Sequence, residues 1–278
     1  MSEILRITTL VENTAGSRVL LGEHGLSLWI ETGDKRVLFD TGQGACLGNN
    51  ARRLGIDLGS ADAIVLSHGH YDHTGGLDVA LAGDEPKTMY AHPAAFEPKF
   101  AVAGGAARYI GTSPEHITKV RRDAELIEVS GPTELGEGLW LTGPVPRTTD
   151  FEDTGGPFFT DREGLTPDEL VDDQAAFVQT PSGTVVILGC AHSGVINTLR
   201  YVRTLTDQGP IHMVLGGMHL VNAGRKRMDR TIDELRDLDV RRLLACHCTG
   251  AAAVARLSKE FPGRCEACPV GTVVKVEG

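Results

Sequence analysis

Runs of apolar residues divide the chain into two regular halves joined by a less regular segment. In the first half, β-branched and apolar residues between Gly-rich turns predict strands, and a segment that stops at Gly55 predicts a helix. The predicted strands cover 4–11, 26–31, 36–40 and 63–66, and the predicted helix covers 45–54.

The second half alternates strands with helices, and polar residues follow directly after each strand. Pro181-Ser182-Gly183 marks a hairpin between the first two strands of this half. Because ligand sites of α/β proteins lie at the carboxyl ends of strands, we expect the functional residues there. The predicted strands cover 175–180, 184–188, 212–215, 242–245 and 272–276, and the predicted helices cover 195–206, 231–238 and 251–261.

The segment of about 86–170 shows no long periodic pattern apart from a predicted strand at 138–142. Prolines and glycine pairs interrupt it throughout. Long irregular segments in compact domains are typical of functional loops, so we interpret this one as a lid-like insertion. The expected organisation is a single domain over 1–278 that carries this insertion.

The strongest chemical signal is the string His68-Gly69-His70-Tyr71-Asp72-His73, directly after the predicted strand at 63–66. Imidazole and carboxylate are good ligands for zinc and similar divalent ions. A turn that leaves a strand can direct His68 and His70 to one point, and Asp72 and His73 to a neighbouring point. A solvated polar turn is the alternative, but four such side chains in six residues favour a metal site.

Three later histidines take equivalent positions, each just past a predicted strand. His192 follows 184–188, His219 follows 212–215 and His247 follows 242–245. We predict that His192 and His247 are metal ligands, and we place His219 at the edge of the site. The other four histidines lack this setting and are predicted to be structural: His24, His92, His116 and His212.

Charge and composition narrow the class of protein. With 27 basic and 37 acidic residues the net charge is −10, which argues against a nucleic-acid binder with a broad basic face. No apolar run approaches the roughly 20 residues of a membrane helix, and the first residues lack the apolar segment of a signal peptide. We therefore expect a cytoplasmic protein with reduced thiols. One alternative for four of the six cysteines is a structural zinc site built from Cys246, Cys248, Cys265 and Cys268.

With His-x-His-x-Asp-His at 68–73 and further candidate ligands in the second half, the sequence resembles the metallo-β-lactamase superfamily. The resemblance implies an α/β (α+β) fold, a four-layer αββα sandwich of two similar halves with metals at one edge of the sheets. Four later segments also resemble the branch named for 7,8-dihydropterin-6-methyl-4-(β-D-ribofuranosyl)aminobenzene-5′-phosphate synthase. These segments cover 170–175, 188–194, 216–220 and 247–250.

The sequence departs from the family pattern at one ligand. Many members carry an Asp after a strand of the second half, where it bridges two metals, but Cys190 stands at the comparable strand end. Either Cys190 is a ligand, or His192 serves from two residues further, or Asp173 substitutes from the preceding loop. The implied cofactor is one or two Zn²⁺ per chain, with Mn²⁺ or Fe²⁺ as alternatives. In the implied arrangement His68, His70 and His192 hold one ion, and Asp72, His73 and His247 hold a second.

The resemblance implies a hydrolase in which a metal-activated water attacks a small organic substrate, with phosphorylated molecules among the candidates. Asp72 would orient the nucleophile, and His219 would act as a general acid or stabilise an anionic intermediate. Arg147 ranks first among the basic residues of the insertion as a partner for an anionic group of the substrate. A synthase that joins a dihydropterin to ribofuranosylaminobenzene 5′-phosphate, and a non-catalytic ligand sensor, are the alternatives. The expected partner is the small molecule alone, without nucleic acid or membrane, and the sequence leaves the oligomeric state open.

Overall fold

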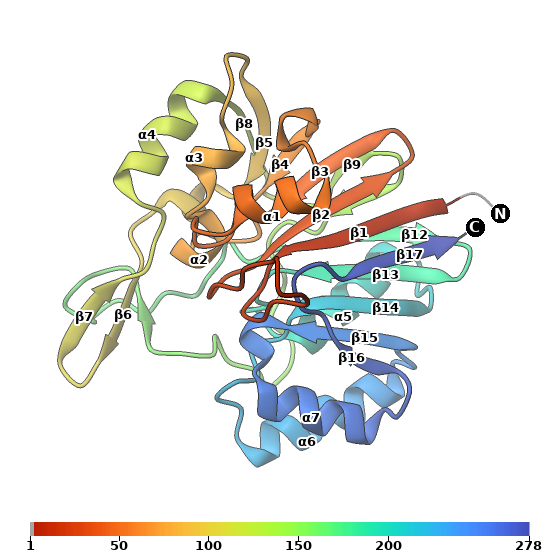
Figure 1. Ribbon diagram of the computed structural model, residues 1–278. Helices are drawn as coiled ribbons and strands as arrows, with labels where there is room; N and C mark the ends of the chain where they lie inside the picture. The colour runs from red at the N-terminus through yellow and green to blue at the C-terminus, as the bar shows by residue number, and fades with distance from the viewer. Residues whose placement is uncertain (1–2, 278) are drawn as a thin grey trace.

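Two seven-stranded sheets lie face to face in the computed structural model, which describes residues 3–277 (Figure 1). The first sheet has the order β17-β1-β2-β3-β4-β5-β8, and the second has the order β16-β15-β14-β13-β12-β10-β9. The strands of the first are β1 (Glu3–Val11), β2 (Ser27–Thr32), β3 (Lys35–Phe39), β4 (Ala63–Val65), β5 (Lys87–Ala91), β8 (Ala124–Glu128) and β17 (Val273–Glu277). Those of the second are β9 (Thr133–Gly136), β10 (Leu139–Leu141), β12 (Ala175–Thr180), β13 (Gly183–Leu188), β14 (Ile211–Gly217), β15 (Arg242–Cys246) and β16 (Cys265–Ala267).

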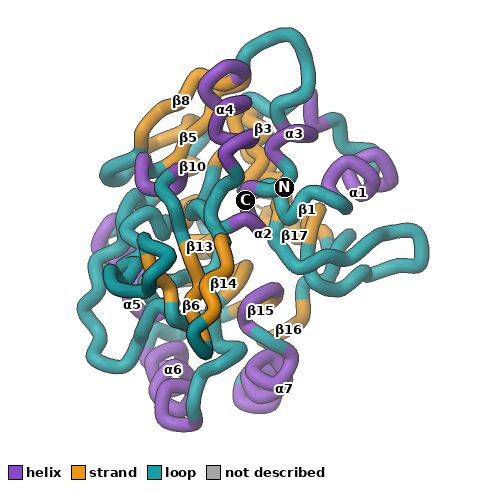
Figure 2. The backbone as a smooth tube through the Cα atoms, turned by 90° about the vertical axis from the view of Figure 1, so that its left-hand side faces the viewer, coloured by secondary structure: helices purple, strands orange, loops and turns teal. Residues whose placement is uncertain are grey.

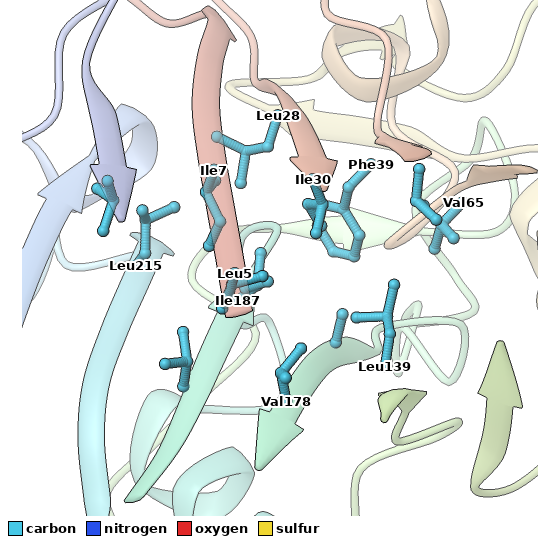
Figure 3. Packing of buried hydrophobic residues seen from close by; sticks show 14 of the residues in the cluster. Leu5, Ile7, Leu28, Ile30, Phe39, Val65, Leu139, Val178, Ile187 and Leu215 are labelled. Atoms are coloured by element: carbon cyan, nitrogen blue, oxygen red, sulfur yellow. The ribbon is translucent and has the colours of Figure 1, made fainter. Parts of the chain in front are cut away.

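The inner faces of the two sheets share one hydrophobic core. Because side chains alternate along a strand, Ile7 of β1 and Phe39 of β3 point inward, toward Ile187 and Leu215 of the second sheet (Figure 3). The intervening Leu38 belongs to the outer face. Both faces of the central strands are therefore buried, which explains why these strands are continuous apolar runs in the sequence.

Helices cover the two outer faces, so the molecule has four layers (Figure 2). The helices over the first sheet are α1 (Leu47–Leu54), α3 (Leu77–Ala80) and α4 (Pro114–Asp123), and those over the second are α5 (Val195–Leu205), α6 (Arg225–Asp237) and α7 (Ala251–Glu260). The remaining short helices are α2 (Tyr71–Thr74) and three 3₁₀ turns, η1 (Leu58–Ser60), η2 (Pro93–Phe96) and η3 (His247–Thr249). This arrangement confirms the expected αββα sandwich. Within residues 3–277, no helix is long and apolar enough to cross a membrane.

The segment of about 86–170 is more ordered, and less of an insertion, than its pattern predicted. Strands β5 and β8 extend the first sheet, and β9 and β10 extend the second. Only a small three-stranded sheet projects from the body, in the order β11-β6-β7 (Figure 1). Its strands are β6 (Phe100–Ala103), β7 (Ala106–Tyr109) and β11 (Phe158–Phe159). The pattern missed strands such as β8 because this strand lies at a sheet edge, where none of its residues is buried and no apolar run is needed.

Candidate metal centre

The carboxyl ends of four parallel strands bring the candidate ligands together. The four strands are β4 of the first sheet, which runs parallel to β3, and β13, β14 and β15 of the second sheet, which run parallel to one another. His68 to His73 follow β4, His192 follows β13, His219 follows β14 and His247 follows β15. Each predicted histidine therefore leaves its sheet at the same edge, as the sequence indicated.

The first group consists of His68, His70 and His192, whose ring nitrogens lie within 4.8 Å of one another. All three side chains are buried. His192 Nδ1 donates to the carbonyl oxygen of Thr154 at 2.7 Å, which leaves Nε2 of that ring with its lone pair. Among the residues that the structure describes, Nε2 of His70 and Nε2 of His192 have no hydrogen-bond partner. Buried ring nitrogens without a partner are costly, and a divalent cation bound to their lone pairs would supply one.

Electrostatics favour the ligating form of these imidazoles. Burial lowers the pKa of His70 to about 3, and burial also lowers the pKa of His68 and His192. The three rings are therefore neutral at pH 7. Neutral imidazole is the form that binds a metal ion.

The second group gathers Asp72, His73, Cys190 and His247. His73 Nε2 lies 3.1 Å from Cys190 Sγ and 3.2 Å from His247 Nε2. Asp72 Oδ2 lies 3.4 Å from His247 Nε2 and 3.9 Å from His73 Nε2. This carboxylate also contacts Nε2 of the more exposed His24 at 3.1 Å, although His24 lacked any metal signal in the sequence.

Hydrogen-bond acceptors fix the orientation of two of these rings. His73 Nδ1 donates to Asp40 Oδ2 at 2.7 Å, and His247 Nδ1 donates to Asn13 Oδ1 at 3.1 Å. Burial alone would lower the pKa of His73, but the Asp40 carboxylate outweighs it and raises the pKa to about 9. Carboxylate–histidine pairs of this kind orient ring ligands in metal sites. Asp40 and Asn13 carried no local signal, because each contacts a histidine far away in the sequence.

Cys190 and Cys248 bring thiols to the same place. Cys190 belongs to one candidate ligand group with His192 and His219, and to another with His247 and Cys248. The His219 ring packs against the His192 ring, with centroids 4.3 Å apart. The Cys190 thiol therefore lies among the candidate histidine ligands.

Two other predicted residues lie behind the ligands. Asp173 Oδ2 accepts a hydrogen bond from the backbone N–H of Ser193 at 2.8 Å, and Asp173 belongs to none of the ligand groups. Arg147 Nη2 donates to the carbonyl oxygens of His192 at 2.8 Å and Glu169 at 3.2 Å. Both residues therefore hold the loop that carries His192, and Arg147 does not line the cavity beside the ligands.

The four-cysteine alternative does not match the structure. Cys246 and Cys268 lie in the core between the two sheets, whereas Cys265 packs on the opposite face among the helices. Cys248 lines the cavity beside the histidines. Because a strand separates these side chains, the four thiols cannot share one ion.

A cavity of about 350 Å³ opens beside the ligands. The small projecting sheet and its flanks supply Arg108, Ile110 and Phe158 to its wall, and Tyr71 completes this side. The Arg108 guanidinium lies over the Tyr71 ring, 5.6 Å from its centroid. The cavity is of the size that holds a small organic molecule.

A buried ion pair links the projecting sheet to the ligand string. Lys99, just before β6, is 2% exposed, and its Nζ lies 3.0 Å from Asp172 Oδ1 and 3.1 Å from Asp168 Oδ2. Asp172 Oδ2 accepts a hydrogen bond at 2.8 Å from the backbone N–H of Gly69, between two candidate ligands. No sequence pattern indicates this ion pair, since Lys99 lies far from Asp168 and Asp172 along the chain.

Four strand ends around the site turn through left-handed backbone without a glycine. Asp40, Ala191, His219 and His247 have φ of 59°, 53°, 45° and 52°. Such conformations cost side-chain-bearing residues about 1–3 kcal/mol each and cluster at functional sites.

Comparisons with known proteins agree with this geometry. The model of the Metallo-beta-lactamase superfamily matches residues 21–247. Over 288 residues the chain is 30% identical to the 7,8-dihydropterin-6-methyl-4-(beta-D-ribofuranosyl)-aminobenzene-5′-phosphate synthase of Methanocaldococcus jannaschii, covering 98% of this chain and 96% of the relative. It is 34% identical over 254 residues to MJ0448 of the same organism, covering 91% and 94%.

A solved structure shows the same similarity. The crystal structure of Tm1679, described as a metal-dependent hydrolase of the beta-lactamase superfamily, has a TM-score of 0.84 and 32% identity. The comparison covers 99% of this chain and 100% of that one. By its motif, its fold and these relatives, the chain belongs to the metallo-β-lactamase superfamily.

Proposed function

We propose that the protein is a metal-dependent hydrolase that activates water against a small organic substrate carrying an anionic group. The observation that carries this proposal is the pair of unpartnered Nε2 atoms of His70 and His192, which lie beside His68 in buried, neutral rings and have no hydrogen-bond partner within residues 3–277. A structural cluster would satisfy these atoms with protein groups. The comparison with Tm1679 supports the reaction class.

Each candidate ligand has a defined part in this proposal. His68, His70 and His192 would hold one divalent ion. Asp72, His73 and His247 would hold a second, with Cys190 beside His73. A bound ion would supply Lewis acidity, which acidifies water and polarises an oxygen of the substrate.

The remaining steps fall to the chain itself. Asp72 Oδ2 accepts from His24 Nε2 and lies near His247, so this carboxylate can orient a nucleophilic water. His219, whose ring packs against the His192 ring, can donate a proton to the leaving group. Phe158 and Ile110 line the same cavity and exclude bulk water from it.

The decisive experiment combines metal analysis with an activity screen. Protein purified without chelator is analysed for bound metals and assayed on phosphate esters, phosphodiesters, lactones and thioesters. We expect His192→Gln to lose bound metal and activity together, whereas His212→Gln, a half-buried histidine of β14 outside the site, retains both. Equal metal content in both variants and in the wild-type protein would refute the assigned ligands.

A second function follows from the synthase of Methanocaldococcus jannaschii, to which 98% of this chain aligns. In this alternative the same metal centre serves the joining of a dihydropterin to ribofuranosylaminobenzene 5′-phosphate. Incubating the metal-loaded protein with these two compounds distinguishes the functions. A joined product without hydrolysis in the ester screen would favour the synthase.

A further inference from the structure

Arg227 of α6 is a buried cation with two unused donors. Its residue is 9% exposed, and Nη1 contacts the carboxylate of Asp153. Within residues 3–277, Nε and Nη2 have no hydrogen-bond partner. These two nitrogens form one edge of the planar guanidinium fork, the edge that holds two oxygens of a carboxylate or a phosphate.

A second cavity of about 360 Å³ lies at this side chain. Arg227, Asn222 and His219 line it, together with the turn at Gly155 and Gly156. His219 also lines the cavity beside the candidate metal ligands, so the two cavities share this residue as a wall. Nδ1 of His219 also lacks a partner in the part of the chain that the structure describes.

The turn opposite Arg227 is shaped around His219. A Cβ atom at Gly155 would lie 1.8 Å from His219 Cδ2, and the φ of +89° at Gly155 also requires glycine. A Cβ atom at Gly156 would lie 2.6 Å from the ring of Phe158, which lines the metal-side cavity. Because only glycines permit this approach, the second cavity is a built part of the site.

We propose that this cavity is a subsite for the anionic group of the substrate, a phosphate or a carboxylate. Arg227 would hold the anion through its free edge once the guanidinium, whose Nε and Nη2 are both buried, turns toward the cavity. The rest of the substrate extends past His219 to the candidate metal ligands. The inference rests on the proposed function, because it assigns the substrate of that same centre to the class of oxyanion-bearing molecules. A buried donor without an acceptor is costly, and an oxyanion supplies two acceptors at once.

Asp153 offers a second variant that tests the proposal. Its carboxylate lies at the rim of this cavity with a side chain that is 71% exposed, next to the largely desolvated guanidinium of Arg227. Its negative charge opposes an incoming anion, although it also fixes Nη1 of Arg227. Asp153→Asn keeps an oxygen acceptor and removes the charge. Anion binding in the cavity should therefore become tighter in this variant.

The experiment titrates inorganic phosphate into the metal-loaded protein at constant ionic strength by calorimetry. We expect Arg227→Met to weaken binding about tenfold or more, equivalent to about 1.4 kcal/mol. Arg225→Met is the matched control, because Arg225 lies on the same helix with a side chain that is 92% exposed; it should leave the affinity unchanged. Arg227→Lys keeps the charge without the planar fork. If Arg227→Met fails to fold, a partial loss of phosphate affinity in Arg227→Lys supports the subsite, and an unchanged affinity overturns it.

His68→Gln separates this inference from the proposed function. Phosphate affinity that survives in His68→Gln and falls in Arg227→Met supports the subsite, and a selenate ion located beside Arg227 in soaked crystals would agree. Affinity lost in His68→Gln and retained in Arg227→Met would place the anion on the metals and overturn the inference alone. An inactive substrate screen with an intact Arg227 effect would overturn the proposed hydrolase and leave the anion site standing.

Discussion

Replacing Lys99 by Met should destabilise the protein far more than its single charge suggests. The ammonium lies within 3.1 Å of two carboxylates, and the side chains of Lys99, Asp168 and Asp172 are at most 6% exposed. Burial alone would lower the pKa of Lys99, but the Asp172 and Asp168 carboxylates outweigh it and raise the pKa, so the cation persists at pH 7. Lys99→Met leaves two buried carboxylates without a counter-charge.

The magnitude follows from the loss of one partner of a buried ion pair, about 3–5 kcal/mol of unfolding free energy. That is a large part of the 5–15 kcal/mol, roughly, that stabilises a typical domain. The matched control is Lys119→Met, which removes a helical pair with Asp123 that is partly exposed to solvent. This pair should contribute only about 0.3–0.5 kcal/mol.

Urea denaturation of both variants at pH 7 measures the difference. Adding Asp172→Asn to Lys99→Met should restore part of the loss, because it removes one unpaired buried charge. If the unfolding free energies of Lys99→Met and Lys119→Met agree within about 1 kcal/mol, the buried network does not carry the stability that we assign to it.

Four further predictions concern the site. In the metal-free protein, the free energy of unfolding should decrease as the pH falls below about 6.5. The unfolded chain binds a proton there, whereas folded His70, with a pKa of about 3, stays neutral. His70→Gln should make this pH dependence less steep. The free energy of unfolding should also decrease as the pH rises from 6.5 through about 9, because folded His73 then loses the proton that Asp40 stabilises. Asp40→Asn should make this pH dependence less steep. Unaltered slopes in these variants would contradict the roles assigned to His70 and to the His73–Asp40 pair. Arg147→Met should lower metal affinity about 10–100-fold, because the Arg147 guanidinium supports the His192 backbone. Competition with a chromogenic chelator measures this affinity. Unchanged metal affinity with a raised KM would instead indicate that Arg147 binds the substrate. Chelator treatment of the wild-type protein should lower the midpoint of thermal unfolding at pH 7, and readdition of zinc should restore it; no shift would argue against a metal bound to the folded state.

The sequence predicted the parts of the fold that periodicity controls. The strands of the second half are buried on both faces and appear as apolar runs, so β12 was predicted at its observed bounds. The helix α6 begins at Arg225, although its apolar pattern is visible only from Thr231 onward, because its first turns are polar. The helix α4 was missed, yet Ser113 followed by Pro114 is a start signal that could have located it.

The candidate site was predicted where its residues have a local signal in the sequence. His68, His70 and Asp72 fall in one string, and the later histidines follow strands, so both signals were visible. Asp40 and Arg227 were not predicted, because their roles depend on residues brought near only by folding. Spacing along a chain cannot indicate such partners.

The left-handed strand ends imply that this protein gives up stability where it places its chemistry. At Asp40, His219 and His247 the side chains are ones the site uses, so glycine cannot take their place despite its easier backbone. Ala191 shares the strained backbone but contributes only a methyl group. An engineer seeking a more heat-resistant variant should therefore begin at Ala191, where glycine relieves strain without removing a functional group.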